Sequence, residues 1–301
     1  MKVKLIAVAK NEARYIQEWC EYHQKLGFNE IIIYDNSGNG DLKSHDNVTV
    51  YNAPGERIQL QAYADALNKL TYGTWAITLD IDEYLDLGGL TVDEFLKPYN
   101  GVDSVKLNWV CYTDNEQLEY EDRPVIERFI RPARLDCIYN DTLKIPENLH
   151  TKSFFCYKYK PTQIDIHCTH IAGGIAINTE GKQVNMDSPF TNELCLKRGF
   201  VRHYITKSTT EWCERRLGVK DACGNVVAEP EVLKRWYFQL NTWSQEKEDI
   251  INAYIERIKR SNEPVSNKCN RSEIQSVGES KGHRTNKRRT CEQAKPVCGG
   301  N

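Results

Sequence analysis

The first hundred residues alternate between short apolar runs and longer amphipathic stretches. Residues 10–27 and 56–73 place apolar side chains at three- and four-residue spacing, which predicts two helices with one apolar face each. Four further segments are short and apolar enough for strands, namely 3–9, 31–34, 47–53 and 75–79. Strands that alternate with helices in this way predict βαβ units and a largely parallel sheet.

Two residues mark the expected ends of the first helix. Asn11 can cap the helix N-terminus with its side-chain oxygen, and Gly27 can adopt the left-handed conformation that ends a helix. His23 lies on the apolar face between them, so we expect it in the core.

The chain beyond residue 101 is less regular. In residues 102–112 apolar and polar side chains alternate, which predicts a strand. Residues 153–159 and 163–173 each predict one further strand, either parallel or antiparallel to its neighbours. A short strand at 200–205 then precedes a helix that starts near Ser208. Residues 246–260 predict a last amphipathic helix, whose apolar face carries Ile250, Tyr254 and Ile258. The pattern thus predicts an α/β fold, with a Rossmann-like, mostly parallel central sheet flanked by helices and a mixed sheet in the second half.

The length of 301 residues fits one large α/β domain or a domain with a substantial appendage. We expect a domain at 1–260, made of a first half at 1–100 and a second half at 101–260. Residues 261–301 are polar, with a basic stretch at 281–290, and predict a disordered tail. Such a tail could contact an anionic membrane surface, and a solvated linker is the alternative.

Charge and hydropathy narrow the class of protein. The formal net charge of −2 gives no signature of nucleic-acid binding. No apolar run is long enough to span a membrane, and the start of the chain turns polar too early for a signal peptide. We therefore expect a cytoplasmic protein, with at most peripheral contact to the membrane.

The eleven cysteines are scattered and form no Cys-x-x-Cys pair. Residues 167–170, "HCTH", are the only metal-like cluster, and no second half accompanies it. Free, mostly buried thiols in a reducing compartment are therefore expected in place of a structural zinc site.

Polar side chains follow three of the predicted strands, at the point where each strand ends. Ligands of parallel sheets bind at the carboxyl ends of the strands, so these residues predict a site there. They are Lys10, Asn11 and Glu12, then Asp35 and Asn36, then Asp80 and Asp82. The alternatives are structural: Asn11 and Glu12 could only cap a helix, and Asp35 could only shape a turn.

Asp80 and Asp82 are two residues apart, so on an extended chain both point to the same side. Two carboxylates on one face repel each other, and a hard divalent cation such as Mg²⁺ or Mn²⁺ would relieve this and bind phosphates. Two acids at a strand end also occur without a metal. Glu83, next to the pair, could bind a surface lysine.

Three segments resemble the family-2-like glycosyltransferases, in the branch related to glycosyltransferase family 92. They are "AVAKNEARYIQEWCEYHQKLGFNEIIIYDNSGNGD", "WAITLDIDEYLDL" and "RHYITKSTTEWCERRLG". The resemblance spans about residues 3–218 and is specific in the first 90. It implies a GT-A fold and the metal-dependent transfer of a sugar from a nucleotide-sugar donor to a glycan or lipid-linked acceptor. UDP-galactose is the first expectation for the donor, followed by UDP-N-acetylglucosamine and UDP-glucose.

The resemblance also implies roles for single residues at the donor site. Asp80 would approach the ribose and Asp35 the base or ribose. Asp82 would hold Mn²⁺ or Mg²⁺ on the diphosphate, and His203 looks like the late histidine that completes this site. The remaining residues implied to bind the donor are Ala7, Ala9, Asn11, Glu12 and Lys207.

The catalytic base is not defined by a motif. Family-2-like enzymes invert the anomeric centre, which requires a carboxylate that deprotonates the acceptor hydroxyl. Asp114 follows a predicted strand of the second half and is our first choice. Glu116, Glu147 and Asp187 are the alternatives.

Two other classes of function share some of these features. Haloacid-dehalogenase-type phosphatases also place Asp-x-Asp after a buried strand, but they expect Thr or Val where this chain has Tyr84, and their motif follows the first strand. A non-catalytic module that binds a nucleotide or sugar would use the same acids without turnover.

Overall fold

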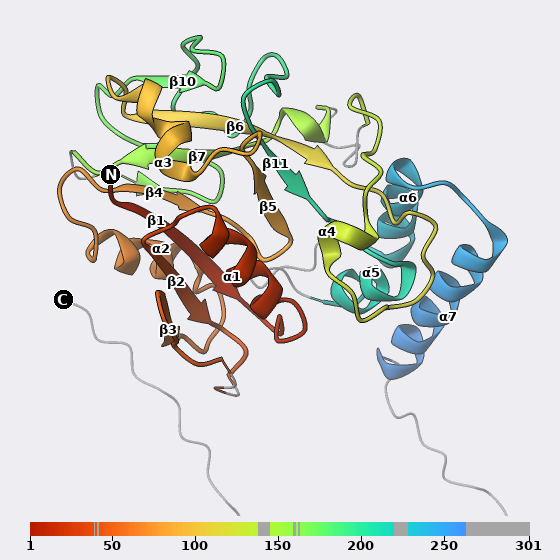
Figure 1. The fold of residues 1–301 in the computed structure, drawn as a ribbon. Helices are drawn as coiled ribbons and strands as arrows, with labels where there is room; N and C mark the ends of the chain where they lie inside the picture. Colours follow the sequence, from red (N-terminus) through yellow and green to blue (C-terminus); the bar gives the residue numbers. More distant parts are fainter. Residues whose placement is uncertain are drawn as a thin grey trace, which may run out of the picture. The chain divides into compact units, whose positions relative to one another are not determined.

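Nine strands form one sheet in the order β3-β2-β1-β4-β7-β6-β11-β5, with β10 beside β6 (Figure 1). Their bounds are β1 Val3–Ala9, β2 Glu30–Asp35, β3 Val48–Asn52, β4 Trp75–Thr78, β5 Glu83–Asp86, β6 Ser104–Cys111, β7 Thr151–Cys156, β10 Ala176–Asn178 and β11 Phe200–His203. The pairs β1–β2, β1–β4, β2–β3, β6–β10 and β6–β11 are parallel. Strand β7 is antiparallel to β4 and β6, and β5 is antiparallel to β11. The predicted α/β fold, with a largely parallel sheet that is mixed in its second half, is confirmed.

This computed structural model describes residues 1–38, 40, 42–137, 145–158, 161, 163–219 and 228–262. Residues Met1–Asn262 form one compact unit, in which the two predicted halves are not separate bodies. The tail predicted at 261–301 lies outside the described residues from position 263 onward. Helix α7 itself runs to Asn262.

Helices cover the sheet on both faces. Their bounds are α1 Ile16–Lys25, α2 Gln59–Leu67, α3 Val92–Leu96, α4 Val125–Arg128, α5 Thr209–Arg216, α6 Pro230–Leu240 and α7 Gln245–Asn262. Strand β1 shows how the faces are divided: Leu5 packs in the core cluster of α1 and α3, whereas Ile6 packs in the cluster of α2. Alternate side chains of a strand point to opposite faces, so α1 and α2 lie on opposite sides of the sheet.

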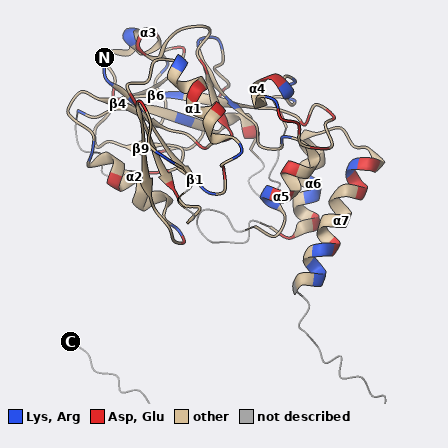
Figure 2. Cartoon of the chain, turned by 60° about the horizontal axis from the view of Figure 1, so that its bottom comes forward, with Lys and Arg blue, Asp and Glu red and all other residues tan. Residues whose placement is uncertain are grey.

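A third apolar cluster joins α5, α6 and α7 (Figure 1). Its innermost residues on α7 are Ile251 and Ile255, while Tyr254 and Ile258 pack at its border. The predicted helix is therefore confirmed, but its apolar face is centred one residue further along than expected. Figure 2 shows acidic residues at the start of α7 and basic residues at its end, the arrangement that suits the helix dipole.

Two local predictions were wrong. Asn11 does not cap α1; it has a φ of 58°, its backbone N–H donates to Ser37, and the helix begins after Tyr15. The strand expected at 163–173 is a hairpin of β8 Gln163–Ile164 and β9 Thr169–His170. By contrast, Gly27 ends α1 as predicted, in a left-handed conformation with a φ of 90°.

Candidate functional site

A cavity of about 830 Å³ lies where β1, β4 and β11 end. The loop after β1, the turn between β4 and β5, the end of β11 and the last turn of α5 all contribute to its wall. Predicted site residues in this wall are Asn11, Glu12, Asp80, Asp82 and His203. The structure thus brings together residues that are up to 192 positions apart, at the sheet edge where the sequence predicts a site.

Asp82 lies at the centre of a positively charged group. Its Oδ2 is 3.2 Å from Nη2 of Arg215 and 3.9 Å from Nη2 of Arg216, and its Oδ1 is 3.9 Å from Nε2 of His203. Burial raises the pKa of the Asp82 carboxyl, but the charges of Arg215 and other nearby cations outweigh burial and lower the pKa below its usual range. Asp82 is therefore an anion although it is 3% exposed.

Asp80 has a different partner. Its Oδ2 is 3.0 Å from Nζ of Lys152, which is also 3.2 Å from Oε2 of Glu83. Lys152 is fully buried on β7, and the antiparallel pairing of β7 with β4 places it level with the turn that carries the acids. The positive charge expected near the two aspartates is therefore supplied in part by the ammonium group of Lys152. Glu83 binds this buried lysine and not a surface lysine.

His203 reaches Asp82 because β11 pairs antiparallel with β5, which aligns His203 with Glu83. The backbone N–H of Tyr204 donates to the carbonyl oxygen of Asp82 at 2.8 Å and fixes this register. Burial lowers the pKa of the His203 imidazole to about 4, which the charge of Asp82 opposes. The ring is therefore neutral at pH 7, and its buried Nδ1 has no hydrogen-bond partner among the described residues.

Lys207 and Asp35 are buried beside the cavity and are not part of its lining. The Lys207 ammonium lies 4.5 Å from the ring centre of Tyr15, a cavity residue, and hydrogen-bonds to no described residue. Burial, with some repulsion from Arg215, lowers the pKa of Lys207 to about 8. Asp35 accepts a hydrogen bond from the backbone N–H of Ser37, as expected for a turn, and its Oδ2 has no described partner.

Ala7 and Ala9, which were expected to bind the donor, point away from the cavity. Both alanines are fully buried in the core cluster of α1, and Val8 between them lines the cavity. Because side chains alternate along β1, the even-numbered residue faces the site here.

Asp114 does not line the cavity. Its Oδ2 is 2.7 Å from Nζ of Lys247 and accepts a hydrogen bond from the Tyr237 hydroxyl, and its Oδ1 accepts from the backbone N–H of Glu116. The expectation that Asp114 meets an acceptor is therefore not supported, because both oxygens are bound within the fold. Glu116 is exposed beside Arg131, and Asp187 pairs with His170, so neither reaches the cavity.

Glu147, the remaining alternative, does line the cavity. It begins the 3₁₀ helix Glu147–Leu149, and its Oε2 is 3.1 Å from Nδ1 of His150. Next to it, the Trp109 ring stacks on His150 at 4.8 Å and contacts the ring of His203 at 4.2 Å. This wall therefore joins a carboxylate to a flat aromatic surface.

Arg215 and Arg216 were not identified from the sequence. They belong to the last turn of α5, where basic residues are favoured by the helix dipole, so their pattern is also typical of an ordinary helix end. Arg215 additionally binds Oε1 of Glu12 at 2.9 Å and so connects the loop after β1 to Asp82. Arg215, Glu12 and Asp82 come together only when the chain folds, so the sequence pattern alone does not indicate their contact.

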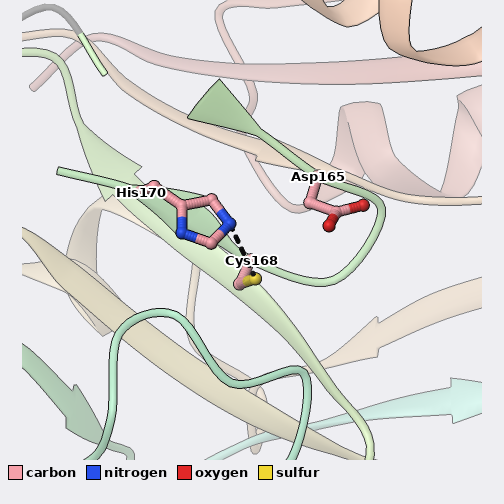
Figure 3. Close-up of side chains that lie close together, drawn as sticks. All are labelled: Asp165, Cys168 and His170. Atoms are coloured by element: carbon pink, nitrogen blue, oxygen red, sulfur yellow. Dashed lines mark hydrogen bonds between the residues drawn. The ribbon is translucent and has the colours of Figure 1, made fainter. Parts of the chain in front are cut away.

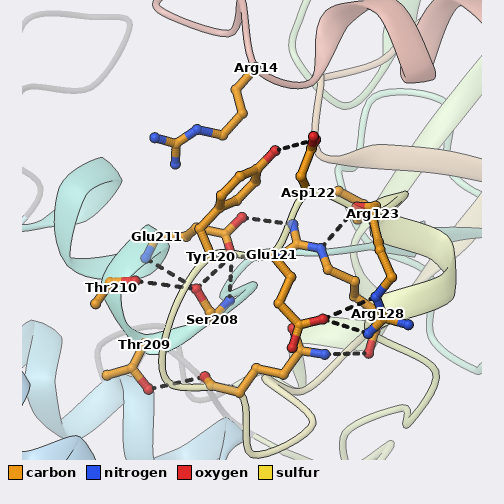
Figure 4. A network of polar contacts seen from close by, with 12 residues as sticks. Arg14, Tyr120, Glu121, Asp122, Arg123, Arg128, Ser208, Thr209, Thr210 and Glu211 are labelled. Atoms are coloured by element: carbon orange, nitrogen blue, oxygen red, sulfur yellow. Dashed lines mark hydrogen bonds and ion pairs between the residues drawn. The ribbon is translucent and has the colours of Figure 1, made fainter.

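A buried polar network fixes the start of α5 (Figure 4). Arg128 donates to both carboxylate oxygens of Glu211, at 2.8 and 2.9 Å, and both side chains are fully buried. Glu211 also completes a capping box with Ser208, as the predicted helix start requires. The helix that carries Arg215 is thereby held in place from its first turn.

No family model matches the chain. A stretch of 101 residues is 32% identical to a glycosyltransferase family 92 protein of Oryza sativa subsp. japonica, covering 30% of this chain. Over this stretch the chain is distantly related to glycosyltransferase family 92. The chain spans only 17% of the length of that relative.

Solved structures give weaker similarities. S. aureus TarS 1–349 in complex with UDP-GlcNAc is matched over 87% of this chain and 74% of that chain, with 14% identity and a TM-score of 0.36. The bifunctional IspDF from Campylobacter jejuni is matched over 86% of this chain and 89% of that chain, with 10% identity and a TM-score of 0.30. These TM-scores are too low to define the fold, so the description of the architecture rests on the strand order of this chain.

Within the described residues, no helix is both long and apolar enough to cross a membrane.

Proposed function

We propose that this chain is an inverting glycosyltransferase of the GT-A type, which moves a sugar from a nucleoside diphosphate sugar, first of all a UDP-sugar, to a hydroxyl group of a glycan or lipid-linked acceptor. The observation that carries the proposal is the buried anion Asp82 among Arg215, Arg216 and His203, in a cavity at the carboxyl edge of a parallel sheet. The distant relationship to family 92 supports the same class of reaction.

The basic residues suit the leaving group. When the bond between the anomeric carbon and the diphosphate breaks, the departing nucleoside diphosphate gains negative charge. Preorganised cations in a site shielded from water stabilise such charge. Arg215 and Arg216 line the cavity, and Lys207 lies directly behind Tyr15. In this proposal Arg215 and Arg216 hold the diphosphate, and Lys207, which does not line the cavity, adds positive charge from behind Tyr15.

The residues around Asp82 also fit a divalent cation. Mg²⁺ is usually held by one or two protein ligands together with phosphate oxygens and water. Asp82 Oδ1 and the neutral imidazole of His203 face each other at 3.9 Å, and the other carboxylate oxygen is engaged by Arg215. Asp82 and His203 would therefore hold Mn²⁺ or Mg²⁺, which when bound would offset the negative charge that the diphosphate gains.

We assign the catalytic base to Glu147 in place of Asp114. The carboxylate of Glu147 would take the proton of the acceptor hydroxyl, whose oxygen then attacks the anomeric carbon as the diphosphate leaves from the opposite face. His150, 3.1 Å away, orients the Glu147 carboxylate. The Trp109 ring beside them offers an apolar surface on which a sugar ring can pack.

The nucleoside would lie at the other end of the cavity. Asn11 and Glu12 line this end together with Val8, and Asp80 remains 35% exposed toward it in spite of its contact with Lys152. Asp35 is buried and does not line the cavity, so in this proposal it shapes the turn that presents Asn36 to the cavity.

The proposal is tested by a screen of nucleotide sugars with Mn²⁺ that measures release of nucleoside diphosphate and the mass of glycosylated product. We expect release with one UDP-sugar and at least about a hundredfold loss in Asp82→Asn. Asp136→Asn, at an exposed acid that pairs with Arg134, is the matched control and should keep full activity. Release of phosphate from simple monoesters would indicate a phosphatase instead, and donor binding without turnover would indicate a binding module.

A further inference from the structure

The hairpin of β8 and β9 divides the "HCTH" motif between two sides. His167 lines the donor cavity, where its ring contacts Trp109. Cys168 and His170 are two residues apart and lie on the other side, and the carboxylate of Asp165, from the same hairpin, lies within 4.8 Å of their ligand atoms (Figure 3). Asp165 therefore supplies one of the additional metal ligands that the motif lacks in the sequence.

Two of the three ligand atoms, Sγ of Cys168 and Nε2 of His170, have the spacing of a zinc site. All three ligand atoms lie within 4.8 Å of one another, and Sγ of Cys168 is 3.7 Å from Nε2 of His170. With Zn–S and Zn–N bonds of about 2.3 and 2.0 Å, a tetrahedral ion separates its sulfur and nitrogen ligands by about 3.6 Å. An ion would fit between these atoms with little movement of the hairpin.

The surroundings of His170 match those of a metal-bound histidine. Its Nδ1 is 2.6 Å from Oδ1 of Asp187, so the carboxylate sets the orientation of the ring and directs Nε2 toward Cys168. Histidines that bind metals commonly make this contact with a carboxylate, which increases their basicity.

The local charges also suit a dication. The Lys106 ammonium donates to the carbonyl oxygens of Met186 and Ser188, on either side of Asp187. With Cys168 as thiolate, the negative charges of Asp165, Cys168 and Asp187 would balance those of Lys106 and one divalent ion.

We propose that Asp165, Cys168 and His170 bind one zinc ion, with water as the fourth ligand. Binding displaces the thiol proton of Cys168 to solvent. The ion would tie the hairpin together and so stabilise the wall of the cavity that carries Ile166 and His167. This site is separate from the donor site and does not depend on the proposed glycosyl transfer.

Cobalt is the probe that tests the site, because a thiolate ligand gives Co²⁺ a charge-transfer absorption. The full-length chain, freed of metal by chelation, is titrated with Co²⁺ and then with Zn²⁺. We expect one equivalent of Co²⁺ to produce the band and Zn²⁺ to abolish it. Cys168→Ser should remove the band, and Asp187→Asn should weaken affinity about 10- to 100-fold.

Two controls make the result specific. Cys156→Ser changes another buried cysteine, on β7, and Asp82→Asn changes the donor site; both should leave the band intact. If Cys168→Ser does not fold, His170→Asn, at a partly exposed side chain, decides by the loss of tight Co²⁺ binding. Absence of the band in the wild-type protein, or its persistence in folded Cys168→Ser or undiminished binding by His170→Asn, would overturn the proposal.

Discussion

Asp114 follows β6 and Glu147 precedes β7, and both carboxylates are buried, yet only Glu147 faces the cavity. Asp114 compensates the buried Lys247, whereas Glu147 contacts His150 at the cavity wall. Burial alone therefore does not distinguish a base from a structural acid. The direction of the side chain and the identity of its partner do.

Exchanging each acid for its amide separates the two roles. Glu147→Gln should lower kcat about 10²- to 10⁴-fold, because the acceptor proton loses its recipient, while the melting temperature stays near that of wild type. Asp114→Asn should lower the melting temperature and leave the kcat of the folded enzyme near wild type, because Lys247 loses its counter-charge. Steady-state kinetics and thermal melts measure both. The reverse pattern would return the base to Asp114.

His23 predicts a pH dependence of stability. The ring is fully buried in α1, and burial lowers its pKa to about 3 from 6.5, opposed by a hydrogen bond to the Trp19 carbonyl oxygen. Between these pH values the unfolded chain holds a proton that the native protein does not. Stability should therefore fall as the pH decreases through this range, by up to about 1.4 kcal/mol per pH unit.

Urea unfolding of His23→Phe at several pH values checks this expectation. Between pH 6 and 4, the free energy of unfolding should depend less on pH in the variant, and the difference in slope should correspond to about one bound proton. His45→Gln controls for removal of an exposed histidine. An identical slope in wild type and His23→Phe would contradict the assignment.

At the scale of single elements, α5 depends on a contact that is distant in the sequence. The buried pair of Arg128 and Glu211 joins the end of α4 to the first turn of α5, and the last turn of α5 presents Arg215 to Asp82. Loss of this pair should therefore affect both stability and the donor site.

Arg128→Met should lower the free energy of unfolding by about 3–5 kcal/mol, because the carboxylate of Glu211 is left buried without its cation. Adding Glu211→Gln should restore part of this loss, since the neutral amide can still accept from Ser208 through its oxygen and can donate to the Tyr15 hydroxyl through its nitrogen. A double-mutant cycle by urea unfolding measures the coupling. Arg134→Met, in an exposed pair, is the control and should leave stability unchanged. Additive losses in the cycle would show that the two residues do not act as a pair.

The elements differ in how well the sequence predicts them. The strands and helices of residues 1–80 are local patterns with a clear period, and the structure confirms β1, α1, β2, β3, α2 and β4. Strand β5 was missed because its residues, "EYLD", carry acids whose partners come from elsewhere: Lys152 binds Glu83 and Arg202 binds Asp86. The pairing of β5 with β11 spans more than 110 residues and leaves no local periodicity.

The candidate site was predictable to the same extent. Asp80, Asp82, Asn11 and Glu12 follow strands whose ends are visible in the sequence, and all four line the cavity. Lys152 lies inside an apolar strand, and Arg215 and Arg216 end a helix, so their meeting with the acids depends on tertiary pairing.

At the scale of the whole molecule, three apolar clusters account for the described core, and their last residue is Ile258. A chain that ends at Asn262 should therefore keep the melting temperature and donor turnover of the full chain. Differential scanning calorimetry of the two forms checks this. A clear fall in melting temperature on truncation would show that residues beyond 262 stabilise the domain.

The central claim is that the cavity binds a nucleoside diphosphate sugar with a divalent cation at Asp82. Calorimetric titration of UDP into the wild-type protein and Asp82→Asn, with and without Mn²⁺, tests it most directly, with Asp136→Asn as the exposed control. We expect Mn²⁺ to tighten UDP binding by at least tenfold in the wild-type protein and in Asp136→Asn, and to have no effect in folded Asp82→Asn. UDP binding of equal strength in all three proteins, or a wild-type protein that binds no UDP with Mn²⁺ present, would contradict the account.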